Sequence, residues 1–184
     1  MNETLKTLLE RRSVRGYKDD LVPAEVLDQI LEAGEYAPSG MGKQGTLMVV
    51  TQNPELVKKL SAMNAAVMGT TSDPFYGAPT VIIVFADSEQ GTYVENGSLV
   101  MGNLMNAAHS LGVDSCWIHR AREVFDSPEG KELKAQWGVP EAYVGVGHCV
   151  LGYRSAEYPQ AKARIVNNFN STVLSHLEDQ ILCK

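Results

Sequence analysis

Two segments of the sequence place basic side chains in a pattern that suits an anionic ligand. In Arg11-Arg12-Ser13-Val14-Arg15, an extended backbone puts Arg11, Ser13 and Arg15 on the same side. Lys162 and Arg164 repeat this spacing far along the chain. Guanidinium groups and a hydroxyl suit a dianionic phosphate, because charged donors form strong, often bidentate hydrogen bonds with its oxygens. Each segment alone also fits a solvated basic surface, but their convergence would form a strongly positive pocket.

A second group of residues has the chemistry of zinc ligands. Cys116 and His119 form a Cys-x-x-His pair, and His148 and Cys149 are adjacent. Neighbours in a strand point to opposite faces, so His148 and Cys149 cannot both reach one metal without a bulge. Core thiols and structural histidines are therefore the favoured interpretation, and no metal is expected.

Two further motifs lack the spacing that their chemistry needs. Gly145-x-Gly147 is not a G-x-G-x-x-G fingerprint and opens no helix, which disfavours a Rossmann dehydrogenase. Ser39 stands in Pro-Ser-Gly rather than in the G-x-S-x-G turn of a hydrolase nucleophile. A structural or ligand-edge role for Ser39 is the better hypothesis.

Composition limits the class of protein. With 184 residues and 44% hydrophobic content, the chain is expected to form a single domain over residues 1–184. A net charge of -6 disfavours a nucleic-acid partner. We find no apolar run of membrane-spanning length and no signal-peptide pattern at the N-terminus, so we expect no membrane association. The three widely spaced cysteines are typical of reduced thiols in a cytoplasmic protein.

Hydrophobic periodicity predicts a mixed domain with four strands and about five helices that position these residues. An extended segment is expected over Ser13–Asp20. The predicted helices are a short one from Leu5 to near Arg12, one from Pro23 to Gly34, Pro54–Met68, Tyr93–Leu111 and a stretch around Glu129–Trp137. The predicted strands are Thr46–Gln52, Thr80–Ala86, Val113–Ile118 and Tyr143–Tyr153.

Three segments carry additional expectations. Ala37–Gly45 contains three glycines and a proline, which predicts a tight, irregular connection. Tyr93–Leu111 is apolar or small on nearly all faces, as expected for a helix buried in the domain or against a partner subunit. Near the C-terminus, Val173, Leu177, Ile181 and Leu182 keep a helical spacing.

Taken in order, several motifs resemble those of the FMN-dependent nitroreductase family over nearly the whole chain. They are Arg11-Arg12-Ser13-Val14-Arg15, Ala37-Pro38-Ser39-Gly40-Met41, Gly77-Ala78-Pro79 before a buried strand, Ser115-Cys116-Trp117-Ile118, and Lys162-x-Arg164. The resemblance implies an α+β, three-layer fold with a mainly antiparallel central sheet flanked by helices. It also implies a homodimer with FMN at the interface and with the tail from about residue 154 packing on the partner subunit.

The resemblance further implies where FMN binds. It places Arg11, Ser13, Lys162 and Arg164 at the phosphate, with Arg12 as a further contact, and Arg15 near the ribityl chain or the N1–O2 edge. Pro38, Ser39 and Gly40 would line the ring edge, and Gln44 and Asn64 would bind the ribityl or pyrimidine end. Ile118, His119 and Arg120 would supply backbone groups near flavin N5. A contribution of the His119 and Arg120 side chains to catalysis is a further hypothesis, weighed against a structural role for His119.

The implied activity is an NAD(P)H-dependent flavin oxidoreductase that reduces nitroaromatic, quinone or related acceptors by a ping-pong hydride mechanism, in which the cofactor carries the redox step. The alternative is a non-catalytic protein that stores or senses FMN. Two departures bear on the acceptor. Gly42-Lys43-Gln44-Gly45 stands where many relatives have Asn-Arg-Gln-Pro, and Ile118-His119-Arg120-Ala121 replaces a common Ile-Gly-Ala-Phe.

Overall fold

The computed structural model describes residues 1–155, 172–174 and 181–183. Its helices are α1 (Glu3–Glu10), α2 (Ala24–Glu35), α3 (Pro54–Met68), α4 (Tyr93–Ser110), α5 (Ala121–Asp126) and α6 (Pro128–Gln136), with a 3₁₀ turn η1 at Gly40–Gly42. Its strands are β1 (Thr46–Thr51), β2 (Thr80–Asp87), β3 (Asp114–Ile118), β4 (Tyr143–Gly152), β5 (Thr172–Leu174) and β6 (Ile181–Cys183).

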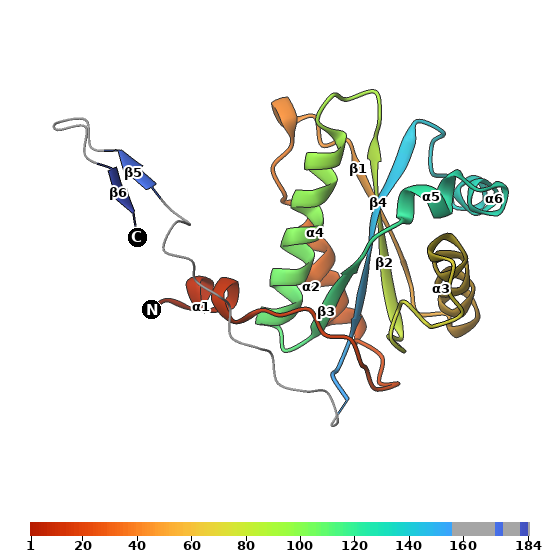
Figure 1. Cartoon of the computed structure of the whole chain (residues 1–184), viewed down its shortest axis with the longest axis horizontal. Coiled ribbons are helices and arrows are strands. Elements are labelled where there is room, and N and C mark those ends of the chain that lie inside the picture. Colours follow the sequence, from red (N-terminus) through yellow and green to blue (C-terminus); the bar gives the residue numbers. More distant parts are fainter. Residues whose placement is uncertain (156–171, 175–180, 184) are drawn as a thin grey trace.

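A four-stranded antiparallel sheet in the order β1-β2-β4-β3 forms the middle layer. Helices α2 and α4 cover one face, while α3, α5 and α6 cover the other (Figure 1). The two inner strands are the most deeply buried, and six consecutive residues of β2 from Val81 to Ala86 are fully inaccessible. This arrangement confirms the expected three-layer α+β fold with an antiparallel sheet.

A bulge in β4 brings α4 close to the sheet. Val84 pairs with Gly147 and Phe85 with Gly145, so Val146 is the extra residue in β4. Its side chain packs on Gly97 of α4, where an added Cβ would lie 2.5 Å from a Val146 methyl carbon. Glycine at position 97 therefore permits the close approach of helix and sheet.

Local signals define α3 at the bounds that the sequence predicts. The Asn53 side chain accepts a hydrogen bond from the Leu56 N–H (3.0 Å), and Pro54 occupies the first helical position. Gly69 ends the helix in the left-handed conformation with φ 70°. All three signals lie within one turn of the helix ends, so they are readable without tertiary information.

The structure corrects the sequence prediction in two places. Ala121–Asp126 forms the additional short helix α5, which has only six residues and too few for a periodic pattern. At the C-terminus, helical spacing gave the wrong element, because Thr172–Leu174 and Ile181–Cys183 pair as antiparallel strands. Residues 156–171, 175–180 and 184 lie outside the described part of the chain, as do Lys162 and Arg164.

None of the helices among the described residues combines the length and apolar composition required to cross a bilayer.

Candidate functional site

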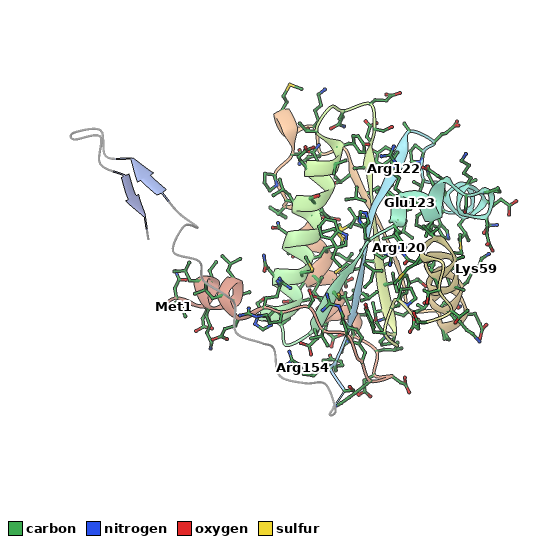
Figure 2. All side chains as sticks on the ribbon, in the orientation of Figure 1. Met1, Lys59, Arg120, Arg122, Glu123 and Arg154 are labelled. Atoms are coloured by element: carbon green, nitrogen blue, oxygen red, sulfur yellow. The ribbon has the colours of Figure 1, made fainter. Side chains whose placement is uncertain are left out.

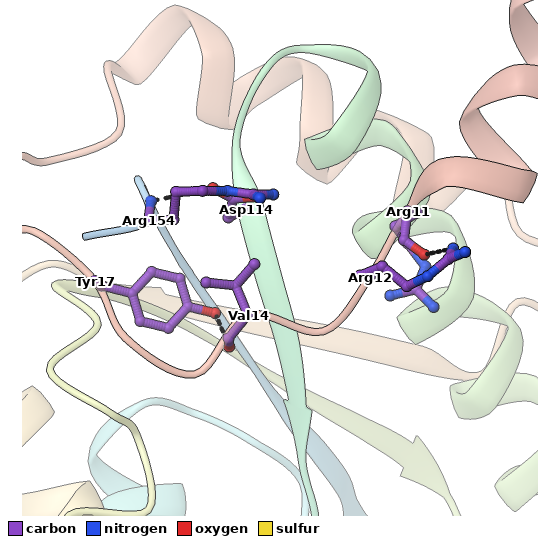
Figure 3. A network of polar contacts seen from close by, with 6 residues as sticks. All are labelled: Arg11, Arg12, Val14, Tyr17, Asp114 and Arg154. Atoms are coloured by element: carbon purple, nitrogen blue, oxygen red, sulfur yellow. Dashed lines mark hydrogen bonds and ion pairs between the residues drawn. The ribbon is translucent and has the colours of Figure 1, made fainter. Parts of the chain in front are cut away.

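The basic segment after α1 runs along the edge of the sheet beside β3. Ser13 and Ser115 form a parallel bridge, and the Val14 N–H donates to the Ser115 carbonyl (3.0 Å). Val14 is fully buried, and the Tyr17 hydroxyl donates to the Val14 carbonyl at 2.8 Å (Figure 3). Burial of Val14 on one side of the extended segment turns Ser13 and Arg15 to the other side.

The charge of the basic segment reaches the thiol of Cys116 in β3. Burial raises the pKa of this thiol, while Arg15, a side-chain hydrogen bond with Ser13, and Arg11 act in the opposite direction. All three lie at alternate positions of the extended segment beside β3. The result is a local concentration of positive charge on a chain whose net charge is -6.

Arg12 faces a different environment. Its Nη1 donates to the Leu9 carbonyl (2.6 Å) at the end of α1. It also donates to the Arg11 carbonyl at 2.8 Å (Figure 3). A cation is favourable there because the last carbonyls of a helix carry partial negative charge. In this structure Arg12 therefore closes α1.

A bidentate ion pair fixes the end of the continuous described chain beside the same segment. Arg154 binds Asp114 through Nε (2.9 Å) and Nη2 (2.5 Å), and the Arg154 N–H also donates to this carboxylate at 3.0 Å (Figure 3). The Ser155 N–H donates to the Gly16 carbonyl (3.1 Å). The chain thus leaves β4 next to the basic segment. Sequence reasoning missed this pair, since its members lie 40 positions apart and share no motif.

At the other end of β3, Asn64 of α3 binds two consecutive residues. Its Nδ2 donates to the His119 carbonyl (2.7 Å), and its Oδ1 accepts from Arg120 Nε (3.0 Å). Asn64 is fully buried, whereas the His119 side chain is exposed. Arg120 lies beside Arg122 and Glu123 at the start of α5 (Figure 2) and has left-handed backbone angles of φ 73° and ψ 12°.

His148 of β4 lies in the core next to this end of β3. It pairs in register with Ile118, and its ring packs against Phe75 and Phe125 at centroid distances of 5.2 and 5.9 Å. Burial lowers the pKa of His148 to about 3, with Arg120 adding to the shift and the Ile118 backbone opposing it. Neither ring nitrogen has a partner at hydrogen-bond geometry within the described residues.

The arrangement of His148 and Cys149 agrees with the argument against a shared zinc ion. His148 packs in the core between the sheet and the helices α3 and α5, whereas Cys149 packs on the face covered by α2 and α4. Burial also raises the pKa of the Cys149 thiol to about 12. Within the described ranges, no group of three potential metal ligands occurs.

The 37–45 loop is built around two side-chain contacts. Ser39 Oγ accepts from the Gln44 N–H (2.9 Å), and Asn96 Oδ1 of α4 accepts from the Gly40 N–H (2.9 Å). Gly40 packs so tightly that an added Cβ would lie 2.3 Å from Thr92 Oγ1. Asn96 was missed by sequence reasoning, although a buried polar residue in an apolar helix is a signal that it could have used.

This loop and the basic segment lie far apart within one chain. The loop contacts the N-terminal end of α4, whereas α1 borders the C-terminal half of α4 across a groove that includes Leu8, Asn103 and Ala107 (Figure 1). Helix α4 has 18 residues, which corresponds to a length of about 27 Å. The structure therefore forms two groups of predicted site residues, one with Arg11, Ser13 and Arg15 and the other with Asn64, His119 and Arg120. The predicted loop residues lie apart from the basic segment, at the N-terminal end of α4: Pro38, Ser39, Gly40 and Gln44.

Two cavities differ in their relation to these residues. A cavity of about 240 Å³ lies between α4 and the ends of β3 and β4, and its lining includes Tyr93, Trp117, His119 and Arg120. A larger cavity of about 740 Å³ beside α3 contains none of the sequence-predicted site residues. In the larger cavity, the Asp73 carboxylate accepts hydrogen bonds from the Ser61 hydroxyl and from the Phe75 and Gly77 N–H groups. The smaller cavity is the one adjacent to the candidate site.

The chain thus forms a three-layer α+β domain with a basic segment along one edge of its sheet, a segment whose charge suits an anionic ligand. Comparison with known proteins is more specific. The profile of the Nitroreductase family matches residues 8–72 and 64–153, and the chain belongs to this family.

Similar proteins of known structure or activity support this assignment. A nitroreductase from Bacteroides fragilis, solved with bound FMN, is 31% identical and superposes with a TM-score of 0.87 over 95% of this chain and 100% of that one. A nitroreductase from Desulfitobacterium hafniense, also with bound FMN, is 29% identical with a TM-score of 0.77 over 91% and 98%. The FMN reductase [NAD(P)H] of Bacillus subtilis is 28% identical over 91% of this chain and 74% of its own length.

Proposed function

We propose that this protein is an FMN-dependent oxidoreductase that takes electrons from NAD(P)H and passes them to small acceptors such as nitroaromatics or quinones. The observation that carries the proposal is the position of the basic segment Arg11–Arg15 along the edge of the sheet beside β3, in a family whose solved members bind FMN. Cationic donors and a hydroxyl are the groups that a flavin phosphate requires.

The residues present fit this cofactor. Arg11, Ser13 and Arg15 supply donors for the phosphate and ribityl chain, and Lys162 and Arg164 are assigned to the same phosphate. Lys162 follows the fixed residue Arg154 by eight positions, and an extended chain of that length spans up to roughly 26 Å. The tail is thus long enough to return to the basic segment that lies beside Arg154. Arg12 and Asn64 are already engaged within the chain and are assigned supporting roles.

The flavin supplies the hydride chemistry when bound, and the protein supplies position and electrostatics. The positive charge of Arg11 and Arg15 favours the anionic phosphate and an anionic reduced ring. The backbone of Ile118, His119 and Arg120 is assigned to the N5 side of the ring. The exposed His119 side chain and the adjacent 240 Å³ cavity are assigned to the acceptor.

The functional unit is a homodimer in this proposal, with the site shared between two copies. Pro38, Ser39, Gly40 and Gln44 lie far from the basic segment of their own chain, so a second copy is needed to bring both parts to one flavin. Tyr36 at the end of α2 is 80% exposed, and Met41 within η1 is 87% exposed. The leucines of α1 are also largely exposed. These apolar surfaces support association with a second copy, which includes packing of the tail from about residue 154 on the partner. The two buried free thiols, Cys116 and Cys149, fit the cytoplasmic location that we infer.

An anaerobic stopped-flow experiment tests the activity. FMN-loaded protein is mixed with NADH or NADPH, and a nitroaromatic or quinone follows once the flavin absorbance has bleached. Rapid bleaching and rapid recovery are expected, and their rates identify the preferred donor. Bound FMN that neither nucleotide reduces would instead favour the non-catalytic FMN-binding protein, and failure to bind FMN would refute the proposed function.

A further inference from the structure

Asn64 contacts the carbonyl of the His119–Arg120 peptide and the side chain of Arg120, just after the end of β3. Its Nδ2 donates to the His119 carbonyl at 2.7 Å, and its Oδ1 accepts from Arg120 Nε at 3.0 Å. Asn64 and His119 are separated by 55 positions in the sequence, and Asn64 is completely buried. A buried amide with both its donor and its acceptor occupied holds its partners in one geometry, because releasing either bond leaves a buried polar group unsatisfied.

The contact with the carbonyl determines the direction of the next N–H. The peptide bond is planar, and the structure contains no cis peptide among the described residues. In a trans peptide the C=O and the following N–H point in opposite directions. Since the His119 carbonyl points to Asn64, the Arg120 N–H points away from α3. Within the described residues, no acceptor takes this N–H.

The strained backbone of Arg120 shows that the surrounding structure imposes the orientation of its N–H. A left-handed backbone costs a residue other than glycine about 1 kcal/mol or more, and Arg120 has φ 73°. Two interactions of Arg120 offset this cost. Its Nε binds Asn64, and its carbonyl accepts from the Val124 N–H (3.0 Å) in the first turn of α5.

We propose that Asn64 is a positioning residue that fixes the His119–Arg120 peptide so that the Arg120 N–H is presented as a hydrogen-bond donor to an acceptor atom of the bound flavin ring. The inference rests on the proposed FMN site, in which the backbone of residues 118–120 faces N5. In this role Asn64 acts through its bonds to His119 and Arg120. It acts through a peptide group that would otherwise be able to rotate.

This role has a consequence that depends on the redox state of the flavin. N5 of the oxidised ring has a lone pair that accepts a hydrogen bond, whereas N5 of the reduced ring carries a hydrogen. A donor held at N5 therefore stabilises bound oxidised FMN more than bound reduced FMN. A merely structural contribution of Asn64 would affect both forms alike.

The experiment compares Asn64→Leu with the unmodified protein by titration with oxidised FMN and with dithionite-reduced FMN. For oxidised FMN, Kd is expected to rise about fivefold to tenfold, the value of one net hydrogen bond. For reduced FMN, a change of less than about twofold is expected, because no acceptor at N5 is lost. Thermal unfolding of each apoprotein is measured in parallel, and Asn64→Ala replaces Asn64→Leu if the latter does not fold.

Asn103→Leu is the matched control. Asn103 of α4 also donates an amide hydrogen bond to a backbone carbonyl, that of Ala33, at 2.8 Å, but it contacts none of residues 118–120. This variant should lower the unfolding temperature and leave the ratio of the two Kd values unchanged. Arg120→Gly keeps both the N–H and the bond from Asn64 to His119, and should bind oxidised FMN more tightly than Asn64→Leu does.

The outcomes separate this proposal from the proposed function. If the unmodified protein binds no FMN, the proposed function is wrong. If it binds FMN and Asn64→Leu weakens both redox forms equally, or neither, the positioning role of Asn64 is refuted while the FMN site stands. Selective weakening of oxidised FMN supports both.

Discussion

The end of β3 and the 37–45 loop both contain non-glycine residues with a left-handed backbone, but the surrounding structure holds them differently. Arg120 (φ 73°) is fixed from the core, through a buried asparagine of another helix. Met41 (φ 54°) and Gln44 (φ 50°) lie in a loop that is held at its base by Asn96 and within itself by the Ser39–Gln44 bond. Met41 is 87% exposed. The first region is fixed by the core of its own chain, whereas the tip of the second is exposed.

Removal of the phosphate contacts on the β3 side should have the largest effect. In the double variant Arg11→Ala and Arg164→Ala, two charge-assisted hydrogen bonds are lost, and Kd for FMN should rise by about a hundredfold or more. Flavin fluorescence quenching measures the affinity, and thermal unfolding verifies that the fold is retained. FMN affinity like that of the unmodified protein would show that these arginines do not bind the phosphate.

Complementation between two defective chains should distinguish a shared site from a site within one chain. One chain carries Arg11→Ala and Arg15→Ala, which both lie in the basic segment, and the other carries Ser39→Ala and Gly40→Val, which displaces the loop from Thr92. Neither homodimer should hold FMN. Arg11 and the 37–45 loop of one flavin site come from different subunits in the proposal, so the purified heterodimer should regain one site per two chains.

The stoichiometry of bound flavin, determined from its absorbance, is the measurement. Chains tagged differently and purified over both tags provide the heterodimer, and the same procedure with two unmodified chains is the control. A heterodimer without FMN would place the loop and the basic segment in the same subunit's site, or the loop outside the site altogether.

Buried His148, which pairs with the end of β3, should make the free energy of unfolding depend on pH. The exposed 37–45 loop should have no such effect. His148 has a folded-state pKa of about 3, below its ordinary value of 6.5, so the unfolded chain binds more protons between these values. The contribution of neutral, buried His148 to the free energy of unfolding is therefore fully present above about pH 6.5. Below that pH it is lost by about 1.4 kcal/mol per pH unit.

Urea unfolding at pH 7, 6 and 5 tests this dependence. His148→Leu should have a shallower decline than the unmodified protein over this range, because the leucine binds no proton in either state. Loop variants such as Ser39→Ala should retain the full decline. If the free energy of unfolding falls equally with pH in His148→Leu and in the unmodified protein, His148 is not the source of the pH dependence.

The smallest expected effect concerns the exposed side chain at the end of β3. His119→Ala should alter the ratio of kcat/KM values between a nitroaromatic and a quinone by about threefold to tenfold, as expected for one polar contact to substrate. Kd for FMN should change less than this ratio, since it is the His119 carbonyl that takes part in the Asn64 contact. An unchanged ratio across several acceptors would assign His119 a structural role.

The parts of the fold that sequence could predict are those whose causes are local. The bounds of α3 follow from Asn53, Pro54 and Gly69, all within one turn of its ends. The alternation of Arg11, Ser13 and Arg15 needs only an extended backbone. By contrast, the contact of Asn64 with His119 depends on packing α3 against the end of β3, which no local pattern encodes.

The misassigned C-terminal segment illustrates the same limit. Val173 and Leu182 fit a helical spacing, yet they pair with each other across two antiparallel strands of three residues each. Apolar residues in such short strands leave too few positions to distinguish a period of two from one of 3.6. The sequence also could not predict the separation of the 37–45 loop from the basic segment, because this separation depends on which end of α4 each of them contacts.

The strand order also bears on how the polypeptide acquires this structure during synthesis. β4 lies between β2 and β3 in the sheet but follows both in the sequence. Until residues 143–152 have been made, β3 has no neighbouring strand of the sheet, and one edge of the apolar strand β2 has no partner. Such non-local pairing slows folding and leaves apolar strands open to association with other chains. The nascent protein is therefore expected to depend on chaperones until its last core strand closes the sheet.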